Sequence, residues 1–178
     1  PASSIQVEQT DGEPPVISWT HPAISVAGFD VYLGDRQTGI KLNDTRLTHC
    51  AFTDIGWSGD SRRYSVVATD LEGVESLGRA IELPAVHSEL AEGSVVRRGL
   101  MNRLVYTVAN QSDDTVAGMR LHVEMDDRSY DSELFSLSAG QTDTIDVVVG
   151  GHETLIDPAE LTSTIEIVPG INTKTRIV

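Results

Sequence analysis

Cysteine, aromatic residues and long apolar runs are all scarce in this chain. Cys50 is the only cysteine among 178 residues, which excludes an internal disulfide and a cluster of thiolate metal ligands. No apolar run approaches the roughly 18 residues of a membrane-spanning helix, so we expect no membrane insertion. Aromatic residues make up 5% of the chain, and few of them are left for ligands once a core is filled.

Basic residues are also few. The chain has 13 Lys and Arg residues against 27 Asp and Glu, a net charge of −14 that both halves share. Such a chain repels phosphate backbones, so we expect no nucleic-acid partner, and the simplest role of the charge is solubility. Because the sequence opens on Pro1-Ala2 without Met or an apolar leader, we expect a processed chain or a piece of a longer protein.

Motifs for catalysis and cofactors are missing. The sequence contains no G-x-S-x-G, no P-loop and no G-x-G-x-x-G after a predicted strand. Cys50 follows a histidine but has no nucleophile motif around it, and we expect it to be semi-buried near a strand start. No two histidines have the i, i+2 or i, i+4 spacing common in zinc sites, and we place His122 on a polar strand face. We therefore expect no catalytic residue, metal or cofactor, with a carboxylate pair acting on glycosides as the enzymatic alternative.

Acidic residues cluster at three places without the spacing of a calcium loop. The clusters are Asp113-Asp114, Asp126-Asp127 with Asp131, and Asp143 with Asp146. Calcium prefers six to eight converging oxygens, commonly from D-x-D-x-D-G with a distal Glu. We interpret the clusters as solvated turns, with calcium at the second as the alternative. Two tripeptides match the N-glycosylation pattern, which is short enough to recur by chance: Asn43-Asp44-Thr45 and Asn110-Gln111-Ser112.

Residues 1–84 alternate in the manner of short β-strands. In the stretch from Tyr64 to Thr69, Tyr64, Val66 and Ala68 share one face, as in a half-buried strand. Asp70-Leu-Glu-Gly73 then supplies turn residues, and a strand returns through 79–83. Earlier strands are expected at 5–7, 16–20, 29–33, 40–43 and 50–53. No window has helical periodicity, and turns recur every 8–12 residues, so the pattern predicts an all-β sandwich.

Four blocks of this part carry a resemblance. They are Ile17-x-Trp19-x-x-Pro22, Phe29-x-Val31-x-Leu33, Phe52-Thr53-Asp54, and Tyr64-x-Val66-x-Ala68-x-Asp70-x-x-Gly73-x-Glu75-Ser76. In this order they resemble a fibronectin type III module. The resemblance implies seven strands, Trp19 in the core, and Tyr64 as a tyrosine corner whose hydroxyl bonds to backbone of the preceding loop. Residues 57–63 lack the proline that often precedes this tyrosine, so we expect a longer or differently shaped loop.

Residues 85–178 form a second predicted all-β unit after the short connector Leu83-Pro84-Ala85-Val86. Met119, Leu121, Val123 and Met125 alternate with polar residues in the clearest half-buried strand of the chain. Other strands are expected at 104–109, 130–137, 145–149, 161–168 and 173–178. The order Asn102-x-Leu104-x-Tyr106-x-Val108-x-Asn110-x-Ser112, the 119–125 strand and Leu137-x-Ala139-Gly140-x-Thr142 is similar to bacterial cell-adhesion-related (CARDB-type) Ig-like domains. Ser112 stands where those domains commonly have glycine.

The sequence thus predicts two tandem immunoglobulin-like β-sandwich domains, 1–84 and 85–178. We expect a non-catalytic structural or interaction segment of a larger, secreted or cell-surface bacterial protein, which spaces and presents neighbouring domains. The alternative is an accessory ligand-binding module attached to an enzyme, with polysaccharide as the candidate ligand. We assign four aromatics to the cores: Trp19, Phe29, Tyr64 and Tyr106. This leaves Trp57, Tyr32 and Tyr130 as the candidate ligand-binding residues. Expected partners are protein or polysaccharide. Trp57 can also fold back to cover the end of the sandwich.

Overall fold

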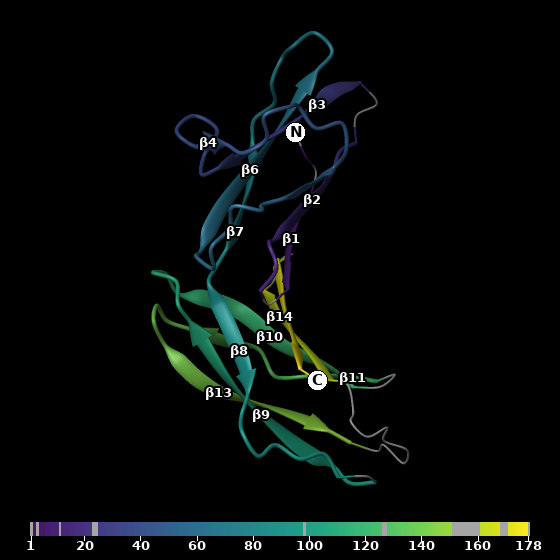
Figure 1. Ribbon diagram of the computed structural model, residues 1–178, viewed down its shortest axis with the longest axis vertical. Helices are drawn as coiled ribbons and strands as arrows, with labels where there is room; N and C mark the ends of the chain where they lie inside the picture. The colour runs from purple at the N-terminus through teal and green to yellow at the C-terminus, as the bar shows by residue number, and fades with distance from the viewer. Residues whose placement is uncertain are drawn as a thin grey trace. The chain divides into compact units, whose positions relative to one another are not determined.

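The computed structural model in Figure 1 contains strands and no helix among the residues it describes. These are residues 2, 4–10, 12–22, 25–97, 99–125, 128–150, 161–167 and 171–177. The expected all-β fold class is confirmed, and no helix of the described part could cross a membrane. The chain divides into two compact units, Pro1–Pro84 and Ala85–Val178.

The first unit consists of two antiparallel sheets. One has the strand order β1-β2-β5 and the other the order β4-β3-β6-β7. Three strands opposite four, with β3 and β6 central in the larger sheet, form a fibronectin type III-like sandwich. The strands are β1 (Ser4–Thr10), β2 (Val16–Thr20), β3 (Val26–Leu33), β4 (Ile40–Lys41), β5 (Ala51–Thr53), β6 (Arg62–Asp70) and β7 (Arg79–Leu83).

Strand register places the alternating apolar residues of this unit in one core. Ile17 of β2 lies opposite Val7 of β1, and Val66 of β6 lies opposite Val31 of β3. All four are buried, as period-two alternation predicts. Trp19 is buried as expected; its ring meets that of Phe29 edge to face, with 5.3 Å between centroids, a favourable arrangement for an aromatic pair.

One glycine is required where β3 is irregular. The register between β3 and β6 shifts at Gly28, whose φ is +151°. A Cβ at this position would lie 2.5 Å from the carbonyl oxygen of Leu47, which exchanges two backbone hydrogen bonds with Phe29. Only a residue without a side chain allows the loop to approach β3 so closely.

The second unit also has two groups of paired strands. One sheet has the order β13-β9-β8; in the other, β10 pairs with β11, β12 and β14, and β14 pairs with β15. The strands are β8 (Val86–Leu90), β9 (Asn102–Asn110), β10 (Val116–Met125), β11 (Arg128–Asp131), β12 (Phe135–Leu137), β13 (Thr142–Val149), β14 (Leu161–Ile167) and β15 (Ile171–Ile177).

The core of the second unit lies between β9 and β10. Tyr106, Met119, Leu121, Val123 and Met125 are fully buried within it. This is the apolar face that the sequence predicts for the 119–125 strand. Its residues therefore hold the two sheets together by burial of apolar surface, without a disulfide.

The strand expected at 130–137 is in fact two short strands. β11 pairs with the end of β10 and β12 with its start, and Ser132 lies between them. The Ser132 amide donates to the Leu121 carbonyl at 2.8 Å, and the Ser132 hydroxyl accepts the Leu121 amide at 3.0 Å. A side chain thus replaces a backbone partner at this point, which interrupts the regular ladder.

Candidate functional site

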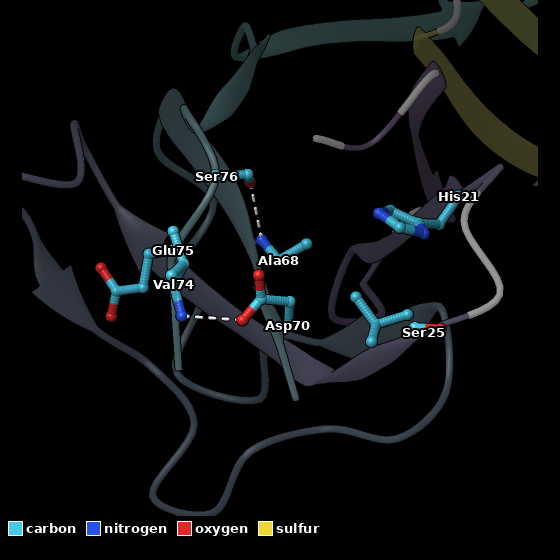
Figure 2. A pocket seen from close by; sticks show the side chains of 8 residues that line it. His21, Ser25, Ala68, Asp70, Val74, Glu75 and Ser76 are labelled. Carbon is cyan, nitrogen blue, oxygen red and sulfur yellow. Dashed lines mark hydrogen bonds between the residues drawn. The ribbon is translucent and has the colours of Figure 1, made fainter. Parts of the chain in front are cut away.

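A hollow of about 240 Å³ opens at one end of the first unit, between the β2–β3 and β6–β7 connections. Figure 2 shows His21 on one side of it and Asp70, Val74 and Ser76 on the other. Its lining consists of His21, Ser25, Val26, Ala68, Asp70, Val74, Glu75 and Ser76. The only sequence signal for this place is the predicted turn at Asp70-Leu-Glu-Gly73, because the other members come from separate strands and connections.

The Asp70 side chain builds the turn that borders the hollow. One of its carboxylate oxygens, Oδ1, accepts the amides of Glu72 at 2.9 Å and Val74 at 2.8 Å. Gly73 adopts φ +84°, and its amide donates to the Asp70 carbonyl at 3.2 Å. The turn is therefore held by its first residue, as the turn residues predict.

Ser76 fixes the connection after the turn against β6. Its hydroxyl accepts the Ala68 amide at 3.1 Å, and its own amide donates to the Ala68 carbonyl at 2.8 Å. On the opposite side, the His21 ring lies edge to face against Phe29, with 5.4 Å between centroids. Both sides of the hollow are thus attached to the core of the unit.

Large apolar side chains are exposed in the connection that borders the hollow. Leu71, Val74 and Leu77, all in the β6–β7 connection, are 74%, 61% and 84% exposed. Exposed apolar residues that occur singly are common, but three within one connection beside a hollow make this end a candidate contact surface. We call these three residues the apolar rim.

The three aromatics selected from the sequence lie at separate places. Trp57 is half-buried in the β5–β6 loop, where its indole N–H donates to the Asp60 carbonyl at 2.8 Å. Tyr32 is half-buried in β3, opposite Lys41 of β4. Tyr130 belongs to the second unit, where it packs against the core and its hydroxyl donates to the Gly150 carbonyl at 2.9 Å. Their role in ligand binding stays a prediction.

A buried polar cluster connects the β5–β6 loop to β6. The Tyr64 hydroxyl donates to Oδ2 of Asp54 at 2.8 Å, and Arg62 Nη1 donates to the same oxygen at 2.5 Å. Arg62 Nη2 donates to the Gly56 carbonyl at 2.9 Å. The expected backbone acceptor for Tyr64 is therefore wrong. A carboxylate takes its place: Asp54, the residue directly after β5, accepts the hydrogen bond of the Tyr64 hydroxyl.

The surroundings of this cluster keep the Tyr64 hydroxyl neutral and the Arg62 guanidinium ionised. Burial, and then the hydrogen bond and charge of Asp54, raise the pKa of Tyr64 far above its usual value, so the hydroxyl stays a donor. Burial alone lowers the pKa of Arg62, but the hydrogen bond and charge of Asp54 raise it overall. Neither group acts as an acid or base near neutral pH, and the cluster is structural.

A second buried carboxylate lies on β3. Oδ1 of Asp30 is 2.9 Å from Lys41 Nζ and 3.2 Å from Asn43 Nδ2, and Oδ2 is 3.2 Å from Arg46 Nη2. Burial favours the neutral acid, but these partners hold the pKa of Asp30 below its usual value. Asn43 also accepts the Val31 amide at 2.7 Å, so the first glycosylation tripeptide begins with a buried structural amide.

The second glycosylation tripeptide also begins with a buried asparagine. Nδ2 of Asn110 donates to the carbonyls of Asp114, Leu137 and Ser138 at 2.8, 3.1 and 3.0 Å. Its Oδ1 accepts the Ser112 amide at 3.0 Å. Neither tripeptide therefore presents a free amide to a modifying enzyme in the folded chain.

The sequence-predicted surface histidine has acidic partners. His122 is half-buried, and its Nδ1 lies 2.6 Å from Asp131, which faces it across the β10–β11 pair. Asp126 and Asp127, the other members of the predicted acidic cluster, lie outside the described residues. Among the residues with described placement, no group of three His, Cys, Asp or Glu side chains could hold a metal ion. Cys50 is half-buried, as expected, and is a free thiol.

No protein-family model and no curated protein matches this chain. Similar solved structures include a chitinase from Bacillus thuringiensis, at 12% identity and TM-score 0.35, covering 93% of this chain and 28% of that one. Fibronectin(III)-like modules of Clostridium thermocellum CbhA are 13% identical at TM-score 0.35, covering 98% and 94%. An exo-chitosanase from Amycolatopsis orientalis is 12% identical at TM-score 0.40, covering 97% and 26%. The chain spans about a quarter of the two enzymes' lengths. The conclusion that holds is one of fold, and it comes from the structure itself: this is an all-β chain of two units, each built from paired antiparallel strands.

Proposed function

We propose that this chain is a non-catalytic segment of a larger secreted or cell-surface protein. It spaces and presents neighbouring domains, and it contacts a partner protein through the end of the first unit that carries the hollow and the apolar rim. The exposed apolar rim is the observation that carries this proposal. A sandwich is a suitable scaffold for such a role because its strands are fixed by the core while its connections are free to vary.

For the second unit we propose membership among the cell-adhesion-related Ig-like domains. The motif position Asn110 supports this assignment, because its amide holds together the end of β9, the Asp114 turn and the end of β12. The implied consequence is a sandwich that is stabilised by burial of its core and not by disulfides.

A triple substitution of the apolar rim tests the first proposal. Leu71→Ser, Val74→Ser and Leu77→Ser together are expected to change the free energy of unfolding by less than about 0.5 kcal/mol, because exposed side chains add little to stability. Urea unfolding followed by tryptophan fluorescence measures this. A matched control, Ile81→Ser, replaces a buried residue of neighbouring β7 and is expected to cost several times more. A loss of more than about 2 kcal/mol in the triple variant would show that the rim serves the fold instead of a partner.

The alternative, a polysaccharide-binding module, has one observation in its favour. The hydrogen bond from Trp57 to Asp60 fixes a half-buried indole ring in the β5–β6 loop, and a fixed aromatic face is what a sugar ring stacks on. Under our proposal, chitin, chitosan and cellulose beads retain the chain no better than they retain Trp57→Ala. Retention that disappears with Trp57→Ala, and persists with Tyr130→Ala in the second unit, would establish the alternative.

A further inference from the structure

We propose that the hollow receives the basic side chain of a partner protein, an arginine or lysine, while apolar residues of the same partner segment lie on the apolar rim. This inference rests on the proposed function, in which this end of the first unit is a contact surface.

The charge of the lining favours a cation. Asp70 and Glu75 line the hollow, whereas none of its described lining residues is Lys or Arg. Glu75 already pairs with Arg36, so Asp70 is the lining carboxylate that is left to attract a further cation. The charge of the whole chain, −14, also attracts basic segments and repels acidic ones.

Asp70 offers an oxygen for the incoming group. Its Oδ1 is occupied by the two amides of the turn, but Oδ2 has no hydrogen-bond or ion-pair partner among the described residues. Figure 2 shows Asp70 and His21 on opposite sides of the hollow, with the Asp70 carboxylate turned toward the Val74 amide. A planar guanidinium can bond to a carboxylate while one face lies against a ring, which makes arginine the better fit of the two basic residues.

The size of the hollow favours one side chain over a larger ligand. Sites for drug-sized molecules commonly enclose about 300–1,000 Å³, whereas this open hollow has a volume of about 240 Å³. A single long side chain fits, and Val26, Ala68 and Val74 supply apolar contact for its methylene stem. Val74 of the apolar rim itself lines the hollow, and Leu71 and Leu77 belong to the same β6–β7 connection, so residues on either side of the basic one can reach the rim.

A neutral isostere of arginine separates the charge from the shape. The ¹⁵N-labelled 178-residue chain is titrated with the peptide acetyl-Leu-Arg-Leu-amide and, in parallel, with the same peptide carrying citrulline in place of arginine. The arginine peptide is expected to shift the amide resonances of Ala68, Val74 and Ser76 with saturation, and to bind about threefold to tenfold more tightly than the citrulline peptide. Equal affinity of the two peptides would contradict the proposal that a basic side chain occupies the hollow.

Two single substitutions locate the effect. Asp70→Asn keeps an oxygen to hold the turn but removes the charge, and it should lower the affinity for the arginine peptide by about threefold to tenfold. Glu72→Gln removes an equal charge from the same turn outside the lining, and it should change the affinity less than twofold. Thermal unfolding of both variants is the control measurement, and it checks that each variant keeps the fold. Equal losses in the two variants would mean a diffuse attraction to an acidic protein, which contradicts a site at Asp70.

The outcomes of the peptide titrations also distinguish a failure of this inference from a failure of the proposed function. If both peptides shift the amides of Leu71, Val74 and Leu77 equally, the contact surface stands and the basic occupant is wrong. If neither peptide shifts any amide at this end at millimolar concentration, both proposals fail. If the same amides shift on raising the concentration of the chain alone, a second copy covers the surface, and the proposed heterologous partner is wrong.

Discussion

Asp54→Ala is expected to lower the free energy of unfolding of the first unit by about 3 kcal/mol, the loss typical when one member of a buried ion pair is removed. The Asp54 side chain is 4% exposed and accepts hydrogen bonds from both Arg62 and Tyr64. Without it, a guanidinium that is 12% exposed loses its close partner and a buried hydroxyl loses its acceptor. Urea unfolding followed by fluorescence measures the change well, because both tryptophans, Trp19 and Trp57, belong to this unit.

Three variants accompany this measurement. Tyr64→Phe removes only the donor hydroxyl and should cost about 1–3 kcal/mol. The double variant that combines Asp54→Ala with Tyr64→Phe should lose less free energy of unfolding than the sum of the two single losses, because both substitutions break the same hydrogen bond. Asp60→Ala removes the second and more exposed carboxylate near Arg62, at 3.4 Å, and should cost at most about 1 kcal/mol. If Asp54→Ala cost no more than Asp60→Ala, the cluster would not be what holds the β5–β6 loop.

Much of the fold follows from alternation in the sequence. Trp19, Phe29, Tyr64 and Tyr106 are predicted core aromatics, and all four are buried. Period two decides this result, since a strand with one face on the core leaves its alternate residues no other place. The acceptor for Tyr64 could not be found in the same way. Asp54 lies in a loop ten residues earlier, where conformation depends on side-chain partners and not on a repeating pattern.

The hollow is even harder to predict from the sequence than the acceptor of the Tyr64 hydroxyl. Asp70 and Gly73 were recognisable as a turn, but His21 comes from a connection some fifty residues earlier in the chain. Their approach depends on the pairing of β3 with β6, which places Val26 opposite Asp70. No local pattern encodes a cavity formed in this way, because its walls meet only after the sheets have packed. The apolar rim was equally hidden, since Leu71, Val74 and Leu77 in a short connection could as well have been core residues.

The motif asparagine of the second unit should be as sensitive as Asp54. Asn110 is 1% exposed and donates to three carbonyl groups, so Asn110→Ala leaves buried acceptors without a donor and the Ser112 amide without its acceptor. We expect a loss of about 2–4 kcal/mol, from one or two unsatisfied buried groups at the usual cost of each. Hydrogen exchange of peptides from β9 and β12, measured by mass spectrometry, should show faster exchange. Gln111→Ala, at the exposed neighbouring position, is the control and should change exchange little.

Asn110→Asp gives the same experiment a pH dependence. The introduced carboxyl group keeps an acceptor for Ser112 but places its other oxygen against the carbonyls of Asp114, Leu137 and Ser138. Ionisation is therefore unfavourable in the folded chain, and the pKa of that group lies above its unfolded value of about 3.9. Below a pH of about 3.9 the group is protonated in both the folded and the unfolded state, and the stability relative to the parent chain is highest. This stability falls as the pH rises from there to the pKa of the group in the folded chain. At neutral pH the loss should exceed that of Asn110→Ala. A loss independent of pH would mean that the amide does not donate to these carbonyls.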